Sequence, residues 1–161
     1  SSAAALHAHC FPALDGQAAG AAVSVRLCGS PAPGVFYALA EQGDVAGLVL
    51  GECGGETPSE RLANALAAKA YFERRWLDDP ESRLEAGRRA FALDRVVSAV
   101  WSTAQPAPSA LALLDAAGAR QAGTYLERSG RLRAAAVADD LSALLAGDGA
   151  LAVVKPLSAQ G

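Results

Sequence analysis

Apolar and polar residues alternate over residues 22–28, and a period of two predicts a strand with one buried face. Two further apolar runs, residues 35–41 and 45–51, flank the turn residues 42–44 and predict a β-hairpin. The second run is almost continuously apolar, which is typical of a strand buried on both faces. This hairpin is the segment around which we expect the rest of the chain to pack.

The apolar period changes after the hairpin to that of an amphipathic helix, from Pro58 to about Trp76. Thr57 and Glu60 form a capping box, and Pro58 occupies the first helical position. A second helix is expected to begin near Pro80, after Asp78 and Asp79 end the first.

The remaining segments read as strands, and the chain therefore predicts an α+β fold. We expect strands at 96–103, 111–115, 122–127, 132–137 and 150–154, with a turn at Ala117-Gly118 and a further apolar segment at 141–145. Residues 1–20 are expected to form an N-terminal helix or arm, and residues 21–161 a single domain. The expected core contains Leu48, Leu50, Leu62, Leu66, Phe72, Leu113, Leu151 and Val153, and Trp76 and Trp101 are expected to be buried as well.

Composition excludes several classes of protein. The chain has 161 residues, a net charge of −3 and 14 scattered basic residues, so no basic stripe favours nucleic acid. No apolar run approaches the roughly 18 residues of a membrane span, and the first residues do not resemble a signal peptide. Three cysteines without a CxxC pair favour reduced thiols. We therefore expect a cytoplasmic protein with no nucleic-acid or membrane partner.

The loop that follows the central strand, residues 51–57, invites two chemical interpretations. Cys53, Gly54 and Gly55 precede a helix N-terminus, a position that can bind a small anion. The same position can activate Cys53 as a nucleophile, although an inert thiol fits the sequence better. The loop lacks the GK[ST] ending of a phosphate-binding P-loop.

His7 and His9 form an HxH pair near the N-terminus. A complete metal site needs three or four ligands, and the sequence has no third histidine. We therefore interpret this segment as structural.

Several stretches, in order, resemble the bacterial PPM (PP2C-like) serine/threonine phosphatases of the SpoIIE/RsbU type. Residues 34–38, GVFYA, stand where the family has GD[FY]YD, and residues 47–55, GLVLGECGG, stand where it has GLVIGDVSG. Residues 147–158 stand where the family has GDxLLLYTDGVT. The resemblance implies a layered α-β-β-α sandwich of antiparallel sheets, here in a shortened form.

The departures from the family motifs fall on its metal ligands. In that family two Mn²⁺ or Mg²⁺ ions are held by aspartates, and a metal-bound water attacks the phosphoserine. Here Val35 and Ala38 stand at the first two ligand positions, Glu52 at the bridging position and Lys155 at the late one. Because hard divalent cations need several oxygen ligands, we expect no metal cofactor. Two interpretations of the last two positions remain open: either Lys155 pairs with Glu52 in place of the cation, or both residues are solvent-exposed ends of strands.

The resemblance thus implies a degenerate domain without phosphatase activity, which acts as a regulatory or protein-binding module in bacterial signalling. Its expected partner is an anti-anti-sigma-type phosphoprotein or a second copy of the chain. One alternative is an active, divergent Mn- or Mg-dependent phosphatase that recruits Glu52, Asp148, Asp44 or Asp139. Another is an unrelated α+β module that binds a small anion at Gly54 and Gly55.

Overall fold

The structure is a computed structural model that describes residues 2–106, 109–121 and 145–157. Its elements are α1 (Ser2–Cys10), β1 (Leu14–Ala18), β2 (Ala21–Cys28), β3 (Val35–Gln42), β4 (Val45–Cys53), α2 (Pro58–Phe72), α3 (Pro80–Ala90), β5 (Leu93–Ser102), β6 (Ala110–Asp115), β7 (Gly118–Gln121) and β8 (Gly149–Pro156). None of the helices within these ranges is long and apolar enough to cross a bilayer.

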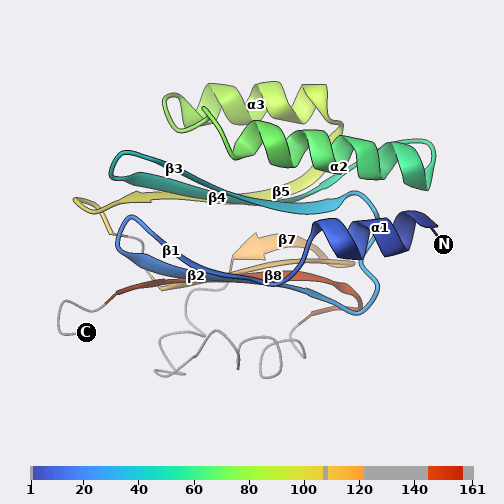
Figure 1. The fold of residues 1–161 in the computed structure, drawn as a ribbon, viewed down its shortest axis with the longest axis horizontal. Helices are drawn as coiled ribbons and strands as arrows, with labels where there is room; N and C mark the ends of the chain where they lie inside the picture. Colours follow the sequence, from blue (N-terminus) through green and yellow to red (C-terminus); the bar gives the residue numbers. More distant parts are fainter. Residues whose placement is uncertain (1, 107–108, 122–144, 158–161) are drawn as a thin grey trace.

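The strands form two antiparallel sheets that face each other (Figure 1). One sheet has the order β3-β4-β5 and carries α2 and α3 on its outer face. The other has the order β1-β2-β8-β6-β7, and α1 lies at one end of the sandwich, in contact with α2. The predicted α+β class with layered antiparallel sheets is therefore confirmed.

The predicted hairpin of β3 and β4 lies at the centre of this arrangement. The two strands pair from Val35 opposite Glu52 to Gln42 opposite Val45. Nearly all of β4 is buried, as its continuous apolar sequence predicts. One of its faces packs on the helices and the other on the second sheet.

The start of α2 follows the predicted capping chemistry. The Thr57 side chain accepts a hydrogen bond from the Glu60 N–H at 3.1 Å, and the Glu60 carboxylate accepts one from the Glu56 N–H at 3.3 Å. The helix ends at Phe72, four residues before the predicted end. The chain leaves the helical path there, and Trp76 is thereby able to reach β4 beside Gly47.

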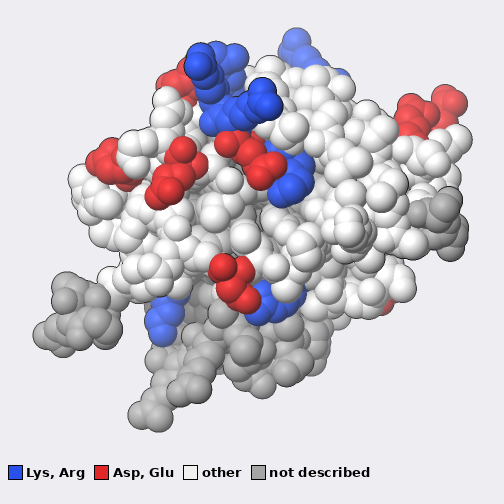
Figure 2. All heavy atoms as spheres, viewed as in Figure 1, with Lys and Arg blue, Asp and Glu red and all other residues white. Residues whose placement is uncertain are grey.

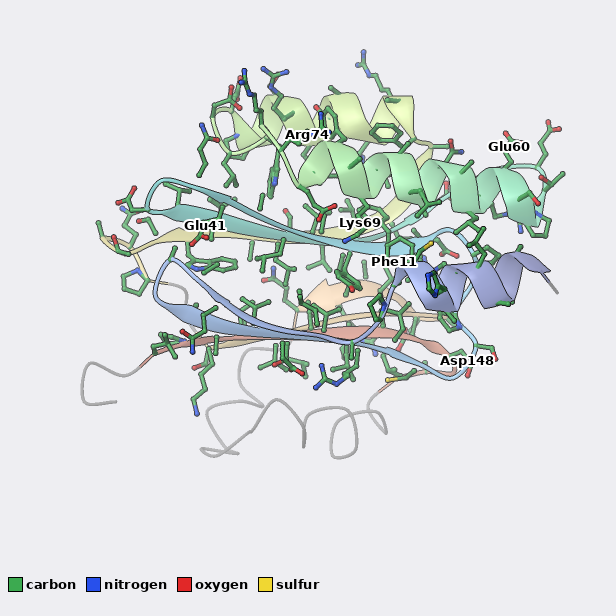
Figure 3. The ribbon with its side chains drawn as sticks, viewed as in Figure 1. Phe11, Glu41, Glu60, Lys69, Arg74 and Asp148 are labelled. Atoms are coloured by element: carbon green, nitrogen blue, oxygen red, sulfur yellow. The ribbon has the colours of Figure 1, made fainter. Side chains whose placement is uncertain are left out.

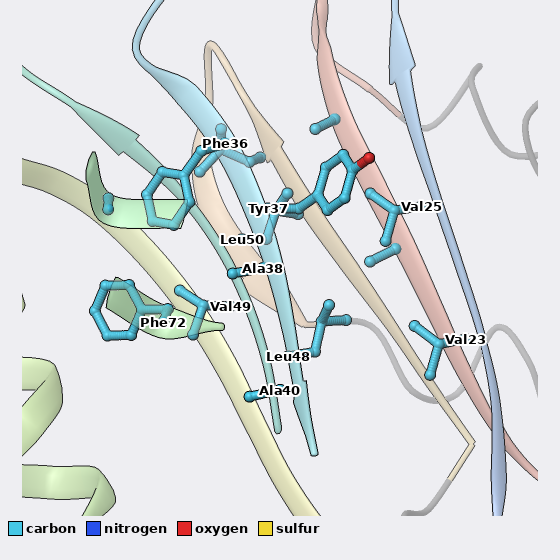
Figure 4. Packing of buried hydrophobic residues seen from close by; sticks show 14 of the residues in the cluster. Val23, Val25, Phe36, Tyr37, Ala38, Ala40, Leu48, Val49, Leu50 and Phe72 are labelled. Carbon is cyan, nitrogen blue, oxygen red and sulfur yellow. The ribbon is translucent and has the colours of Figure 1, made fainter. Parts of the chain in front are cut away.

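Two layers of packing share β3, because its side chains alternate between the faces of the sheet (Figure 4). Tyr37 and Leu48 point toward β2 and β8, whereas Phe36 stacks on Phe72 of α2 with ring centroids 6.0 Å apart. Seven of the eight residues expected in the core are buried, and Leu66 is half-buried. Trp76 and Trp101 are buried as predicted.

Two polar side chains tie the N-terminal segment to the sandwich through backbone carbonyls. The Tyr37 hydroxyl donates to the Pro12 carbonyl at 2.5 Å, and the Trp101 indole N–H donates to the Ala18 carbonyl at 2.9 Å. These bonds hold both ends of the segment that contains β1. The strand β1 was not predicted, because its sequence Leu-Asp-Gly-Gln-Ala has few of the residues that favour strands.

The hairpin after the helices differs in register from the prediction. The turn falls at Ala116-Ala117, one residue before the predicted Ala117-Gly118, because Asp115 pairs with Gly118 and the returning strand β7 runs from Gly118 to Gln121. The Asp115 carboxylate accepts the N–H of Ala117, which tightens the turn and brings the strand forward. The strands predicted at 122–127 and 132–137, and nearly all of the apolar segment 141–145, lie outside the described residues.

We predict that Gly47→Ala destabilises the protein by about 1–3 kcal/mol, the usual cost of overpacking a core. A Cβ at this position would lie 2.5 Å from atoms of both Trp76 and Leu77. Gly16→Ala is the matched control, because a Cβ there meets no atom within 4 Å. Urea denaturation of the two variants provides the measurement, and equal stability of both would contradict this account of the packing.

Candidate functional site

The candidate site lies at the end of the sandwich where β3 begins and β4 ends. Val35 and Glu52 are partners in the register of these strands, so the structure brings two of the expected site positions together. The Gly54-Gly55 loop and the start of α2 follow directly. This is the region in which the family resemblance places a metal centre.

The Glu52 carboxylate is bound by a guanidinium. Arg95 stands opposite Glu52 in the register of β4 and β5, beside a β-bulge. Its Nε donates to Glu52 Oε1 at 3.0 Å, and its Nη2 donates to the same oxygen. Its Nη1 donates to the backbone carbonyl of Asp115 on the second sheet. Arg95 therefore links the two sheets at this end.

Asp115 extends this network, and its carboxylate is fully buried. Both carboxylate oxygens accept hydrogen bonds from Arg120, at 2.7 and 2.9 Å. The backbone N–H groups of Ala117 and Ala146 also donate to it, at 2.8 and 2.5 Å. The hydrogen bonds from Arg120 hold the pKa of Asp115 far below its usual range, and the backbone donors add to this shift.

The prediction of an ion pair between Lys155 and Glu52 is wrong. Lys155 lies opposite Ala22 in β2, beside the β1–β2 turn, whereas Glu52 lies at the other end of the sandwich. Since β8 runs antiparallel to β2, its first residues and not its last reach the Glu52 end. Asp148 precedes β8 and lies there, close to Gly29.

The two remaining family positions present no oxygen ligand from their side chains. Val35 is buried, and its carbonyl lies 2.7 Å from His7 Nε2. Ala38 is also buried, but it stands three residues further along the strand and therefore faces the helices. Within the described ranges, no group of three or more His, Cys, Asp or Glu side chains is placed to hold a metal ion.

The polar groups of the Gly54-Gly55 loop are largely satisfied within the protein. The Gly54 N–H donates to the Ala92 carbonyl at 2.7 Å, and its carbonyl accepts from the Asn64 side chain at 2.9 Å. The Gly55 carbonyl accepts from Arg61 Nε at 3.0 Å. A Cβ on Gly55 would lie 2.9 Å from the Arg61 nitrogen, so close packing explains this glycine.

Cys53 has the environment of an inert thiol. It is buried, and this burial raises its pKa to about 12, to which the nearby carboxylates of Asp94 and Glu52 contribute. A thiol with this pKa is almost fully protonated near neutral pH and is a poor nucleophile. The structure thus supports the inert interpretation of Cys53.

The HxH pair does not converge on one point. His7 is buried against β3, and its ring lies 4.9 Å from that of Phe11 between centroids, whereas His9 is exposed. The two imidazoles lie in different environments, which agrees with a structural role for α1.

Sequence reasoning missed Arg95, Asp115 and Arg120, the residues that complete the network around Glu52. The available signal was a charge at an inward position of an apolar strand. Arg95 is followed by Val96 and Val97, and Asp115 follows Leu113 and Leu114. Charges in such positions need partners, because burying an unpaired charge is costly.

Comparison with known proteins gives a similarity in structure alone. No protein-family model matches the chain, and no curated protein matches its sequence. The fold is similar to that of RsbX, a PP2C-type phosphatase whose crystal structure was solved in complex with magnesium. The TM-score is 0.60, the sequence identity is 9%, and the match covers 90% of this chain and 100% of the RsbX chain. The chain thus has a PP2C-like fold.

We predict that native Cys53 reacts with iodoacetamide at pH 8 on the order of 10³ times more slowly than in the unfolded chain. The raised pKa leaves almost no thiolate to react. A variant with Cys10→Ser and Cys28→Ser isolates the Cys53 signal, which mass spectrometry can follow. Rapid labelling of the native protein would show that this thiol is exposed and activated.

We also predict that Asp115 makes the protein sensitive to acid. Its native pKa lies below the unfolded value of about 3.9, so its contribution to stability is present above that pH and is lost as pH falls. Asp115→Asn is expected to lower stability at pH 7 by about 1–3 kcal/mol and to flatten the pH dependence below about pH 5. Urea denaturation between pH 2 and pH 7 measures both effects.

Asp15→Asn is the control for this experiment. Asp15 pairs with Arg26 at 2.9 Å, but its side chain is 52% exposed, so we expect a loss of at most about 1 kcal/mol. An equal slope against pH in both variants would mean that Asp115 does not carry the acid sensitivity.

Proposed function

We propose that this chain is a PP2C-like domain without metal-dependent phosphatase activity, and that it acts as a regulatory, protein-binding module in bacterial signalling. The observation that carries the proposal is the Arg95 guanidinium, which binds the Glu52 carboxylate. The positively charged guanidinium thus bonds to the carboxylate that a metal ion at this end would need as a ligand.

The donor set at this end does not fit a pair of divalent cations. Mg²⁺ and Mn²⁺ prefer carboxylate and water oxygens, usually from several residues. Here Val35 supplies a hydrocarbon side chain, Ala38 faces the helices, and Glu52 is neutralised by Arg95. Asp148 lies at the same end but packs beside Gly29. We therefore assign no catalytic step to this site.

Loss of the metal leaves binding as the function that the fold can still perform. The resemblance of the sequence to phosphatases of bacterial signalling suggests an anti-anti-sigma-type phosphoprotein as the partner, or a second copy of the chain. Such a domain would sequester its partner and leave any phosphate on it intact. Binding without release of phosphate is the behaviour that separates this proposal from an active enzyme.

We predict that the chelator-treated protein shows no calorimetric binding of Mn²⁺ below about millimolar concentration, because too few carboxylates converge. We further expect no turnover of an aryl phosphate in the presence of Mn²⁺. Micromolar binding together with turnover would overturn the proposal and favour the active, divergent phosphatase. In that case Glu52 and Asp148 are the first residues to substitute.

Arg95→Ala is a sharper version of the same test. This variant frees Glu52 but restores none of the missing ligands, so we expect it to remain unable to bind Mn²⁺. Arg89→Ala provides a control, because Arg89 is 83% exposed and pairs only with Glu85 among the described residues, at 3.4 Å. Metal binding gained in Arg95→Ala alone would show that the guanidinium, and not the lost carboxylates, excludes the metal.

A further inference from the structure

A second candidate site lies in the helical layer, where the end of α2 meets the start of α3. A hollow of about 540 Å³ is lined there by Ala70, Tyr71, Arg74, Arg75 and Arg83. Its volume falls within the range of small-ligand pockets. Figure 3 labels Arg74 at this end of the layer and Glu60 at the opposite end of α2. The hollow is therefore remote from Glu52 and Arg95.

The lining of the hollow is strongly basic. Arg74 and Arg75 are exposed, and neither has a carboxylate within 4.0 Å in the part of the chain that the structure describes. Arg83 pairs with Asp78 at 3.6 Å, but both side chains are nearly half exposed, which makes the pair weak. Figure 2 shows basic side chains gathered over this helical layer, with acidic ones beside them.

Helix stability explains only part of this arrangement. Arg74 and Arg75 follow the C-terminus of α2, where the helix dipole favours cations. Arg83 belongs to the first turns of α3, where the dipole disfavours a cation. The exposed pair with Asp78 offsets only part of this unfavourable placement.

Tyr71, which lines the hollow, is held in place by a hydrogen bond and by aromatic packing. The Tyr71 hydroxyl donates to the Arg83 backbone carbonyl at 2.9 Å, which joins the two helices beside the arginines. The Tyr71 ring packs edge-on against Phe72 and Phe91, with centroid distances of 4.9 and 5.5 Å. The side from which the guanidinium groups project is thus rigid, although the groups themselves are exposed.

We propose that this hollow binds a phosphate monoester group. Guanidinium groups donate paired hydrogen bonds that match phosphate oxygens, and a phosphate monoester carries close to two negative charges at pH 7. The group can belong to a phosphorylated serine or threonine of a peptide or to a small molecule. This inference does not rest on the proposed function, because it uses none of the residues at the Glu52 end.

The test is a calorimetric titration of the whole chain with four probes. These are a phosphoserine peptide of otherwise neutral sequence, its unphosphorylated form, inorganic phosphate and sulfate. We expect saturable binding of the phosphopeptide, none of the unphosphorylated peptide, and weaker binding of sulfate. Inorganic phosphate that binds as tightly as the phosphopeptide supports the site and identifies a small-molecule source.

Two double variants with the same change in charge locate the binding. Arg74→Gln with Arg75→Gln removes two guanidiniums from the hollow, and we expect affinity for the phosphopeptide to fall at least about tenfold. Arg88→Gln with Arg89→Gln alters exposed arginines at the far end of α3, and we expect less than about a twofold change. Thermal unfolding checks that both variants remain folded.

Three results would overturn the proposal. The first is an equal loss of affinity in the two double variants, which would show attraction to overall charge alone. The second is the absence of saturation at millimolar phosphopeptide. The third is tighter binding to vesicles that contain an anionic lipid than to the phosphopeptide, which would identify a membrane-facing patch.

Discussion

β4 has no polar face, and this constraint determines how the rest of the chain is arranged. A strand that is apolar on both sides must be covered by a layer on each side. Phe72 of α2 and Trp76 of the segment between α2 and α3 cover one face, and the sheet that contains β2 and β8 covers the other. The sandwich is the solution that buries both faces at once, and both of its ends remain available for polar groups.

At one of these ends, charged side chains pair with one another and with backbone groups. Carboxylates and guanidiniums that lose water need partners with good geometry, and unpaired buried charges are strongly destabilising. Arg95 meets this need by bonding to Glu52 on its own sheet and to the Asp115 backbone on the other, while the Asp115 carboxylate is satisfied by Arg120 and two N–H groups. The result is a network whose charges neutralise one another within the protein. Such a network has little capacity left for an external ion.

Patterns within short segments predicted these helices and strands well, because such secondary structure depends largely on neighbouring residues in the sequence. The β3–β4 hairpin and the capped start of α2 follow from apolar period and from Thr57, Pro58 and Glu60. Long-range pairing was harder to predict. The direction of β8 relative to β2 decides which end of β8 reaches Glu52. The sequence of β8 itself does not indicate this direction, and the prediction therefore placed Lys155 at the wrong end of the sandwich. Arg95 was missed because its partner is 43 residues away.

Many of the bonds that join distant segments end on backbone carbonyls. His7 bonds to that of Val35, Tyr37 to that of Pro12, and Trp101 to that of Ala18. A main-chain acceptor is supplied by any residue, so the receiving positions can change during evolution without loss of the bond. Only the donor side chains need to be retained. A fold tied in this way tolerates extensive divergence of sequence, which is consistent with a shared architecture at 9% identity to RsbX.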